Sequence, residues 1–428
     1  MIKILLGGSP CTHWSIAQKN DRETQPNSGL GWELFLNYKI ALEKYKPDYF
    51  LYENNESASQ AIKDEIARQL NVVEPDLLTP DNGIRMTHIN SALLSAQRRE
   101  RFYVTNFGDI WQPQDRGILL KDVLDGIPVN ATADGDKART LMAGYYKYGT
   151  ATLLTNKGFK GGTTAVAEPV RVGAVARSNG DLTVDKGIPP CIIKSYDKAV
   201  EKYGYIPEIY NPYNNTEITN KSPTLTTQCG LKTGSSSLMI VVPICQAYPC
   251  EWDESGRPTK AISGADGKIH LVYEVKDGFI TIKDKQYPIK LPDGFYIIRK
   301  LTVSECKRLQ TIPDWYEFPV SDSQAYKMIG NGWTVEVIKH LLSHIPNIQN
   351  EEIEVLSMYD GMSCGQIALE EMGCNVVKYY ATEIDKYAIQ TTQHNFPNTI
   401  QLGDAFQVRE KGWHIRKETI HNGFLACW

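Results

Sequence analysis

Apolar and polar positions follow a regular order along the first hundred residues. Short apolar runs at Ile2 to Leu6, Tyr49 to Tyr52 and Arg101 to Thr105 have the length of buried strands. Between them, apolar residues recur at helical spacing from about 30 to 45 and again from Ser59 to Leu70. Strands that alternate with helices are typical of a parallel sheet with crossover helices. The pattern predicts an α/β fold for this part of the chain.

The same order returns near the end of the sequence. Ile353 to Tyr359 is an apolar run, Asp360 to Gly365 a glycine turn, and Gln366 to Met372 a helical segment, with a further strand at Val376 to Ala381. Before it, His344 to Glu352 is a polar, proline-containing stretch that we expect to be a linker.

The middle of the chain has a different texture. From about 110 to 295, Gly, Pro, Asn and Thr are frequent, the predicted strands are short and helical periodicity is weak. This indicates a separate, irregular β-rich domain. Helical patterns return at Thr302 to Gln310 and Val335 to Ser343.

Composition narrows the class of protein. The 428 residues suffice for two domains, and no apolar run approaches the ~18 residues of a membrane helix. Nine cysteines without CxxC pairs indicate neither a disulfide framework nor a metal site, and favour a reducing cytoplasm. The net charge of −4 does not indicate a nucleic-acid partner, yet it does not exclude one, because phosphate contacts need only a local basic stripe.

The late glycine turn has the form of a nucleotide site. Glycines such as Gly361 let the backbone approach a ligand, and the following helix presents free N–H groups. Glu383, about 20 residues further on, is placed to bind ribose hydroxyls, and Asp404 after the next strand is placed to bind an adenine amino group. By itself, the pattern favours the glycine-rich turn of an ordinary α/β domain over a site for an adenosyl cofactor.

Candidate catalytic residues lie near the other end. Cys11 stands in a Gly-Gly-Ser-Pro-Cys loop directly after the first strand, although most lone cysteines are small buried hydrophobes. A nucleophilic cysteine needs surroundings that favour its thiolate. Glu53 ends the second strand, where a carboxyl group points into the ligand crevice of an open sheet or serves a structural role. Gln97 to Arg101, taken alone, fits a solvated charged turn.

Together these residues resemble the motifs of the DNA cytosine-5 methyltransferases. Gly8 to Cys11 with Ser15 is similar to the Pro-Cys loop of that family, Glu53-Asn54 to its Glu-Asn-Val motif, and Gln97 to Arg101 to its Gln-x-Arg-x-Arg motif. Further similar segments are Pro223 to Thr226, Arg299 to Asp314, Gly330 to Val335, Tyr359 to Gly365, Glu383 and Asp404. The resemblance covers nearly the whole chain and is least clear from 110 to 220.

The order of the motifs departs from the family. The cofactor motifs normally come first, whereas here they follow residue 353. Joining the two ends of the chain restores the usual order, so the sequence resembles a circularly permuted member of phage or bacterial type. Thr12 and Asn55 also stand where many relatives have Gln and Val.

The resemblance implies a fold and a division of the chain. We expect an α/β, Rossmann-like S-adenosylmethionine-dependent methyltransferase sheet, mostly parallel with helices on both faces, and a smaller irregular β-rich target-recognition domain. The expected segments are the catalytic half at 1–115, the target-recognition domain at 116–298, a return segment at 299–344, the linker at 345–352 and the cofactor-binding half at 353–428.

The resemblance also implies a reaction, with S-adenosylmethionine as cofactor and no metal. Cys11 would add to C6 of a cytosine flipped out of double-stranded DNA at a specific short sequence, Glu53 would donate to N3, and Arg99 would hold O2. The methyl group would pass to C5, after which the C5 proton and then Cys11 would leave. The stretch 12–28 would form a lid over the flipped base.

The resemblance assigns three sets of site residues. The catalytic set is Cys11, Ser15, Glu53, Asn54, Arg99 and Arg101. The cofactor set is Asn331, Gly332, Trp333, Tyr359, Asp360, Gly361, Met362, Ser363, Cys364, Gly365, Glu383, Ile384 and Asp404. The DNA-recognition set is Gln97, Thr224, Leu225, Arg299 and Arg308.

Two other functions remain open at this point. An RNA cytosine-5 methyltransferase would share the cofactor site and the cysteine, and a non-catalytic DNA-binding decoy would share the fold. The large middle segment and the intact Cys11, Glu53, Arg99 and Gly361 favour the DNA enzyme. We expect a protein without membrane contacts that acts as a monomer in the cytoplasm of a bacterial or phage-infected cell. A cognate restriction endonuclease and the recognition sequence are left open.

Overall fold

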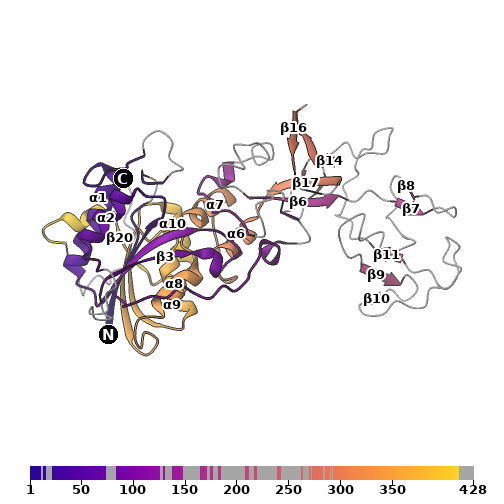
Figure 1. Ribbon diagram of the computed structural model, residues 1–428. Coiled ribbons are helices and arrows are strands. Elements are labelled where there is room, and N and C mark those ends of the chain that lie inside the picture. Colours follow the sequence, from indigo (N-terminus) through magenta and orange to yellow (C-terminus); the bar gives the residue numbers. More distant parts are fainter. Residues whose placement is uncertain are drawn as a thin grey trace. The chain divides into compact units, whose positions relative to one another are not determined.

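The chain forms two compact units (Figure 1). The computed structural model describes residues 1–10, 13–15, 22–73, 83–125, 137–147, 164–170 and 293–413, with short strands between 129 and 291. The first unit comprises Met1–Ile118, Thr140–Tyr146 and Cys306–Trp428, and the second comprises Leu119–Arg139 and Lys147–Glu305.

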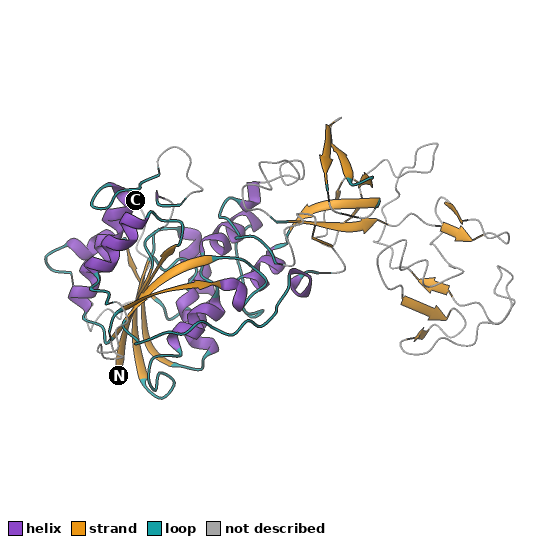
Figure 2. Cartoon of the chain, in the orientation of Figure 1, coloured by secondary structure: helices purple, strands orange, loops and turns teal. Residues whose placement is uncertain are grey.

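A seven-stranded sheet is the centre of the first unit, in the order β20-β19-β18-β1-β2-β4-β3 (Figure 2). Neighbouring strands are parallel except on both sides of β4. The strands are β1 (Ile2–Gly7), β2 (Tyr49–Asn55), β3 (Arg85–Asn90), β4 (Glu100–Thr105), β18 (Glu352–Met358), β19 (Asn375–Thr382) and β20 (Ile400–Gly403). The predicted mostly parallel sheet is confirmed. Its central strands are continuous apolar runs because both of their faces are buried.

Helices flank this sheet. They are α1 (Gly29–Tyr45), α2 (Gln60–Gln69), α7 (Asp322–Asn331), α8 (Val335–Leu342), α9 (Cys364–Glu371) and α10 (Lys386–Asn395), and α6 (Val303–Leu309) enters this unit at its C-terminal end. In Figure 1, α1 and α2 lie to one side of the strands, and α8 and α9 to the other. Helix α2 begins where predicted, because the Ser59 side chain accepts a hydrogen bond from Ile62 N. Among the described residues, no helix has the length and apolar character needed to cross a bilayer.

The segment expected to be a linker, 344–352, is packed rather than loose. Ile345 and Ile348 are buried, and the Gln349 side chain donates to the carbonyl of Met372 at 2.8 Å. The Gln349 bond ties the segment to Met372 at the C-terminal end of α9.

The second unit is an antiparallel β structure, as its composition predicted. A six-stranded sheet runs in the order β16-β15-β14-β17-β6-β5. Its strands are β5 (Val129–Asn130), β6 (Ala165–Val170), β14 (Val272–Lys276), β15 (Phe279–Ile282), β16 (Lys285–Pro288) and β17 (Gly294–Lys300). The remaining short strands are β7 (Ala174–Ala176), β8 (Leu182–Val184), β9 (Glu208–Asn211), β10 (Thr216–Ile218), β11 (Met239–Val241), β12 (Ile262–Ser263) and β13 (Ile269–His270).

A buried ion-pair network holds the β6–β17 pair. Arg299 is only 1% exposed, and its guanidinium contacts Glu168 and makes two bonds with Glu305, at 2.7 and 2.9 Å. The Glu305 carboxylate also accepts from the backbone N–H groups of Asp125 and Thr302. The expectation that Arg299 contacts DNA is therefore corrected: its side chain is enclosed by two carboxylates and is not exposed to a phosphate.

We predict that Glu305→Ala destabilises this unit by about 3–5 kcal/mol, because it leaves a buried guanidinium and two N–H groups without their acceptor. Urea denaturation measures the loss, and hydrogen exchange at β17 localises it. Glu351→Ala, which removes a partly exposed pair with the N-terminal amine, is the control and should leave stability unchanged. Equal stability of Glu305→Ala and wild type would show that the network does not stabilise the unit.

Candidate active site

β1, near the start of the chain, and β18, which begins at Glu352, leave the sheet side by side. The strands pair in parallel, and Gly7 stands opposite Met358 as the last pair. A Cβ atom on Gly7 would lie 2.8 Å from the Met358 carbonyl oxygen, so only glycine permits this approach. The loop after β1 and the turn after β18 consequently start side by side at the carboxyl edge of the sheet, where ligands bind in open α/β folds.

Glu53 of β2 lies directly beside the loop after β1. A Cβ atom on Gly8 would lie 2.6 Å from the Glu53 carbonyl oxygen and 2.8 Å from its Oε2. Two donors hold the buried carboxylate: Arg101 Nε lies 2.9 Å from Oε1, and Trp333 Nε1 donates to Oε2 at 3.0 Å. The side chain is therefore fixed in one orientation, with both oxygens in use.

Asn54 fixes the loop itself. Its amide donates to the Ser9 carbonyl at 3.0 Å, the Ser9 hydroxyl at 3.1 Å and the Tyr52 hydroxyl at 3.1 Å. Ser9 and Tyr52 also share a hydrogen bond of 2.8 Å. Ser9 and Asn54 are both buried, so this network sets the direction in which the chain leaves toward residue 11.

The arginines of the Gln-x-Arg-x-Arg segment do different things. Arg99 is buried and donates to three backbone carbonyls: Leu141 at 3.2 Å, Gly330 at 3.3 Å and Gly332 at 2.8 Å. Arg101, in contrast, pairs with Glu53. Arg101 is thus the arginine beside Glu53, and Arg99 clamps the turn that carries Trp333. The expected contact of Arg99 with O2 of the base stays a prediction.

Gln310 completes this clamp. It is fully buried, and its amide donates to the carbonyls of Ile329 at 2.9 Å and Gly332 at 3.3 Å. Its Oε1 accepts from the Thr334 hydroxyl at 2.8 Å. The sequence placed Gln310 in a family-like segment without assigning it to the site, because nothing in the segment shows which carbonyls its amide reaches.

The turn after β18 has an uncommon backbone. Tyr359, Gly361 and Ser363 have φ angles of 60°, 59° and 59°, in the left-handed region. Glu383, beyond the end of β19, accepts from Gly361 N at 2.8 Å and from the N–H groups of Ile384 and Asp385 at 2.7 and 2.8 Å. A single carboxylate thus fastens the glycine turn to the neighbouring loop.

Asp360 is a half-buried carboxyl in this turn. Loss of hydration on burial raises its pKa to about 6, although hydrogen bonds from Ser363 and from Tyr379 (2.9 Å) lower the pKa, and the Glu383 charge adds to the rise. Asp360 therefore titrates close to neutrality.

These parts enclose a cavity of about 230 Å³. Of the predicted residues, the cavity wall includes Glu53, Arg99, Arg101, Asn331, Gly332, Trp333, Tyr359, Asp360, Gly361, Met362, Cys364 and Glu383. Wall residues that the sequence analysis did not assign to the site are Gly8, Ser9, Pro10, Lys327, Met328, Ser357, Asp385 and Ala388. Lys327 and Asp385 form an ion pair of 2.7 Å at this wall, a contact between distant segments that sequence spacing does not reveal.

Other predicted residues lie apart from the cavity wall. Ile384 is 74% exposed, and the exposed Asp404 accepts from Phe406 N at 2.9 Å at the start of a short 3₁₀ helix, η5 (Ala405–Arg409). Gly365 lies behind the turn, where a Cβ atom would be 2.6 Å from Leu6. Gln97, Ser15 and Ser363 are buried and Arg308 is half-buried, so Gln97, whose Oε1 accepts from Leu141 N, is not an exposed DNA contact. Cys11, Thr224 and Leu225 lie outside the described residues.

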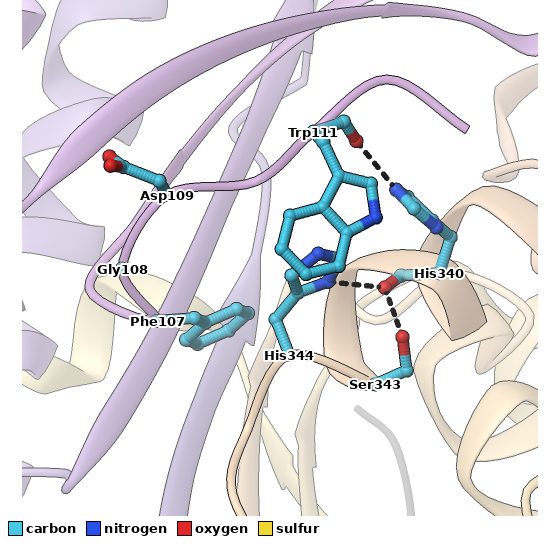
Figure 3. A pocket seen from close by; sticks show the side chains of 7 residues that line it. All are labelled: Phe107, Gly108, Asp109, Trp111, His340, Ser343 and His344. Carbon is cyan, nitrogen blue, oxygen red and sulfur yellow. Dashed lines mark hydrogen bonds between the residues drawn. The ribbon is translucent and has the colours of Figure 1, made fainter. Parts of the chain in front are cut away.

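A second cavity, of about 570 Å³, lies at the opposite edge of the sheet (Figure 3). Asn106, directly after β4, donates to the carbonyl of Asp48 before β2, which places the following residues where the parallel strands begin. Here the Trp111 and His344 rings lie 4.6 Å apart, and His340 donates to the Trp111 carbonyl. This cavity shares no wall residue with the first.

Comparison with known proteins assigns the family. The family model of the C-5 cytosine-specific DNA methylases matches residues 1–115 and 193–347, more than half of the chain. The chain belongs to this family. The match includes Gly8 to Pro10, Glu53 and the Gln97 to Arg101 segment, and it ends before the turn at Tyr359.

Individual relatives match this chain over shorter stretches. The type II methyltransferase M.NlaX of Neisseria lactamica is 51% identical over 41 residues, 10% of this chain and 13% of the relative. M.HhaI of Haemophilus parahaemolyticus is 31% identical over 93 residues, 21% of this chain and 28% of the relative. The DNA (cytosine-5)-methyltransferase DRM2 of Arabidopsis thaliana is 21% identical over 258 residues, 54% of this chain and 38% of the relative. The chain thus spans 38% or less of the length of these relatives.

Among solved structures, the S. pombe Dnmt2 methyltransferase is similar at 13% identity with a TM-score of 0.27, over 81% of this chain and 78% of that one. The fold assignment rests on the strand order and register given above rather than on this value.

Asp360 gives a pH prediction. A carboxyl whose pKa is higher in the folded chain than its ordinary value stabilises the fold fully below about pH 4, and this stabilisation is lost as the pH rises through about 6. Asp360→Asn should therefore gain on the order of 1–2 kcal/mol relative to wild type between pH 4 and 7, allowing for partial exposure.

Thermal unfolding across this pH range measures the difference. Asp385→Asn is the matched control. Burial raises the pKa of Asp385, but the ion pair with Lys327 lowers it by more, so the pKa lies below its ordinary value. This variant should therefore be less stable than wild type by a constant amount above about pH 4, with any pH dependence of the difference confined to lower pH. A pH-independent difference between Asp360→Asn and wild type would contradict the assignment.

Proposed function

We propose that the protein transfers a methyl group from S-adenosylmethionine to C5 of a flipped-out cytosine in double-stranded DNA, with Cys11 as nucleophile. One observation carries the proposal. Glu53, held between Arg101 and Trp333, shares a single cavity with the loop that leads to Cys11 and with the glycine turn after β18.

Each protein group has a defined task in this reaction. The Cys11 thiolate adds to C6 of the cytosine, which activates C5, and it leaves after C5 has lost its proton. Glu53 holds the proton at N3 during the addition. Arg101 and Trp333 fix the Glu53 carboxyl. We assign the contact with O2 of the base to Arg101 in place of Arg99, because Arg101 lies beside Glu53.

The chemistry of the turn fits the cofactor. A Cβ atom on Gly361 would meet nothing within 4 Å, so the space over this residue is open to a ligand. Glu383 already accepts from Gly361 N and has the oxygen lone pairs that ribose hydroxyls need. Tyr359, Asp360 and Trp333 would line the same site. When bound, S-adenosylmethionine supplies the methyl group on an electrophilic sulfonium.

Circular permutation accounts for the extent of the family match. The family model matches residues 1–115 and 193–347 but not 348–428. In the structure, however, β18, β19 and β20 belong to the same sheet and continue it by parallel pairing next to β1. Met1 N and Glu351 Oε2 lie 3.4 Å apart, so β1 and β18 begin at the same edge. We infer that the cofactor-binding half has moved from the front of the chain to its end.

The antiparallel second unit is the candidate target-recognition domain. It is inserted between the catalytic segments, and its size favours DNA over RNA as substrate. In this assignment the enzyme acts as a monomer, and a partner endonuclease is a separate question. The alternative functions, RNA methylation and non-catalytic DNA binding, predict different outcomes in the following assay.

We predict that the wild type transfers label from S-adenosylmethionine to unmethylated genomic DNA and that Cys11→Ala does not. The variant should still bind S-adenosylhomocysteine, because its change lies in the loop rather than in the glycine turn. Cys374→Ala, at a half-buried cysteine of the same unit, is the control and should keep full activity. Nucleoside mass spectrometry places the label. Label in RNA alone favours the RNA enzyme, and cofactor binding without any transfer favours the decoy.

Substitution of Arg101 and substitution of Arg99 should have different effects. Arg101→Ala should lower kcat by about a hundredfold or more while the fold stays intact, because Glu53 loses a positioning donor next to the base. Arg99→Ala should lower the unfolding temperature as well, because the carbonyls of Gly330, Gly332 and Leu141 lose their donor. Single-turnover rates and thermal unfolding separate them. Full activity of Arg101→Ala would rule out its proposed role.

A further inference from the structure

Tyr359 has a backbone conformation that a bulky residue rarely adopts, with φ at 60°. Contacts from outside the turn hold it there. Its backbone N–H donates to the Thr382 hydroxyl at 3.0 Å. Its own hydroxyl donates to the Leu34 carbonyl of α1 at 2.8 Å and accepts from the Asn37 amide at 3.3 Å.

Asn37 is fully buried on α1, close to the aromatic residues Phe35 and Tyr38 of the core. An amide in such surroundings is costly unless its hydrogen bonds are made. Here both ends are used: Oδ1 accepts from Arg409 Nε, and Nδ2 donates to Tyr359. An apolar side chain could fill the same space but could not make these two hydrogen bonds. We therefore attribute the presence of an amide here to the hydrogen bonds.

The direction of these bonds is determined by chemistry. A guanidinium has donors only, so Asn37 must present its oxygen to Arg409 and its NH₂ group to Tyr359. The Tyr359 hydroxyl then accepts from Asn37 and donates to Leu34. Arg409 is anchored in turn on α1, with Nη2 donating to the Glu33 carbonyl at 3.0 Å and lying 2.7 Å from its carboxylate.

The relay joins three elements around the proposed cofactor site. Asn37 belongs to α1, Arg409 to η5 directly after β20, and Tyr359 to the turn that lines the 230 Å³ cavity. Glu53 and its partners take no part in it. A change in the relay should therefore alter the glycine turn without altering the carboxylate that serves the base.

We propose that Asn37, oriented by Arg409, is a positioning residue that holds Tyr359 for cofactor binding. The inference rests on the proposed function, because it concerns the same cavity. It assigns to Asn37 control of affinity for the S-adenosyl nucleoside, separate from the rate of methyl transfer once the cofactor is bound.

A double-mutant cycle tests this relay. Calorimetry measures the Kd of S-adenosylhomocysteine for wild type, Asn37→Ala, Tyr359→Phe and the double variant. Asn37→Ala, which removes one hydrogen bond to Tyr359, should raise Kd by about tenfold, and Tyr359→Phe, which removes the bonds to both Asn37 and Leu34, should raise it at least as much. The double variant should bind no more weakly than Tyr359→Phe alone, because the Asn37 amide acts through the Tyr359 hydroxyl. For Asn37→Ala, the kcat at saturating cofactor should stay within about twofold of wild type.

Tyr45→Phe is the matched control. Tyr45 lies on the same helix, and its hydroxyl donates to the carbonyl of Glu354 in β18 at 3.2 Å, away from the cavity wall. This variant should keep the wild-type Kd, even though it also loses a buried hydroxyl contact between α1 and β18. Asn37→Asp keeps an acceptor for Arg409 but loses the donor to Tyr359, so it should bind as weakly as Asn37→Ala.

The outcomes separate the inference from the function. If wild type does not bind S-adenosylhomocysteine, the proposed function is wrong. If wild type binds but Asn37→Ala and Tyr359→Phe bind as tightly as Tyr45→Phe, the function stands and the role of Asn37 is overturned. Additive losses in the double variant would also overturn it. Should Asn37→Ala fail to fold, Tyr359→Phe keeps Asn37 in place and still decides the question.

Discussion

The parallel pairing of β1 with β18 is the contact on which the rest of the site depends. It joins the first strand of the chain to one that begins at Glu352, and it runs in register up to Gly7 and Met358. Both segments leave the sheet at this pair. Any side chain at Gly7 would collide with the Met358 backbone, so the pairing could not reach the edge. The loop after β1 and the glycine turn are neighbours only because it does.

The position of the Glu53 carboxylate follows from this arrangement. Its neighbour Gly8 leaves room for the carboxylate, and its two donors come from different parts of the chain. Arg101 is placed by the antiparallel pairing of β4 with β2, and Trp333 by a turn whose carbonyls Arg99 and Gln310 hold. In the proposed reaction, a carboxyl group that holds a proton at one ring atom needs this kind of second support.

The apolar pattern predicted the strands and helices whose buried positions are apolar. It did not predict elements that have polar residues at buried positions or that bury few residues. The central strands are buried on both faces and are continuous apolar runs. Helix α10 was not predicted, because Thr391 and Thr392 fill buried positions that an apolar pattern would mark, and the edge strand β3 was missed because it buries little beyond Arg85 and Ile89. The positions of the family-like motifs could be found in the sequence, but the residues that their side chains contact could not. Arg99 precedes β4 and Arg101 lies within it, so strand alternation could not separate their roles.

The glycine turn is shaped by its surroundings rather than by its own residues. Left-handed φ angles at Tyr359 and Ser363, and a half-buried carboxyl at Asp360, each cost free energy. The compensating hydrogen bonds come largely from Thr382 and Tyr379 on β19 and from the Leu34 carbonyl on α1. Because these hydrogen bonds come from β19 and α1, the surrounding sheet and helix determine the shape of the turn. A site ordered in advance loses less entropy on binding, and this is the physical advantage of storing strain in a turn braced by a rigid sheet.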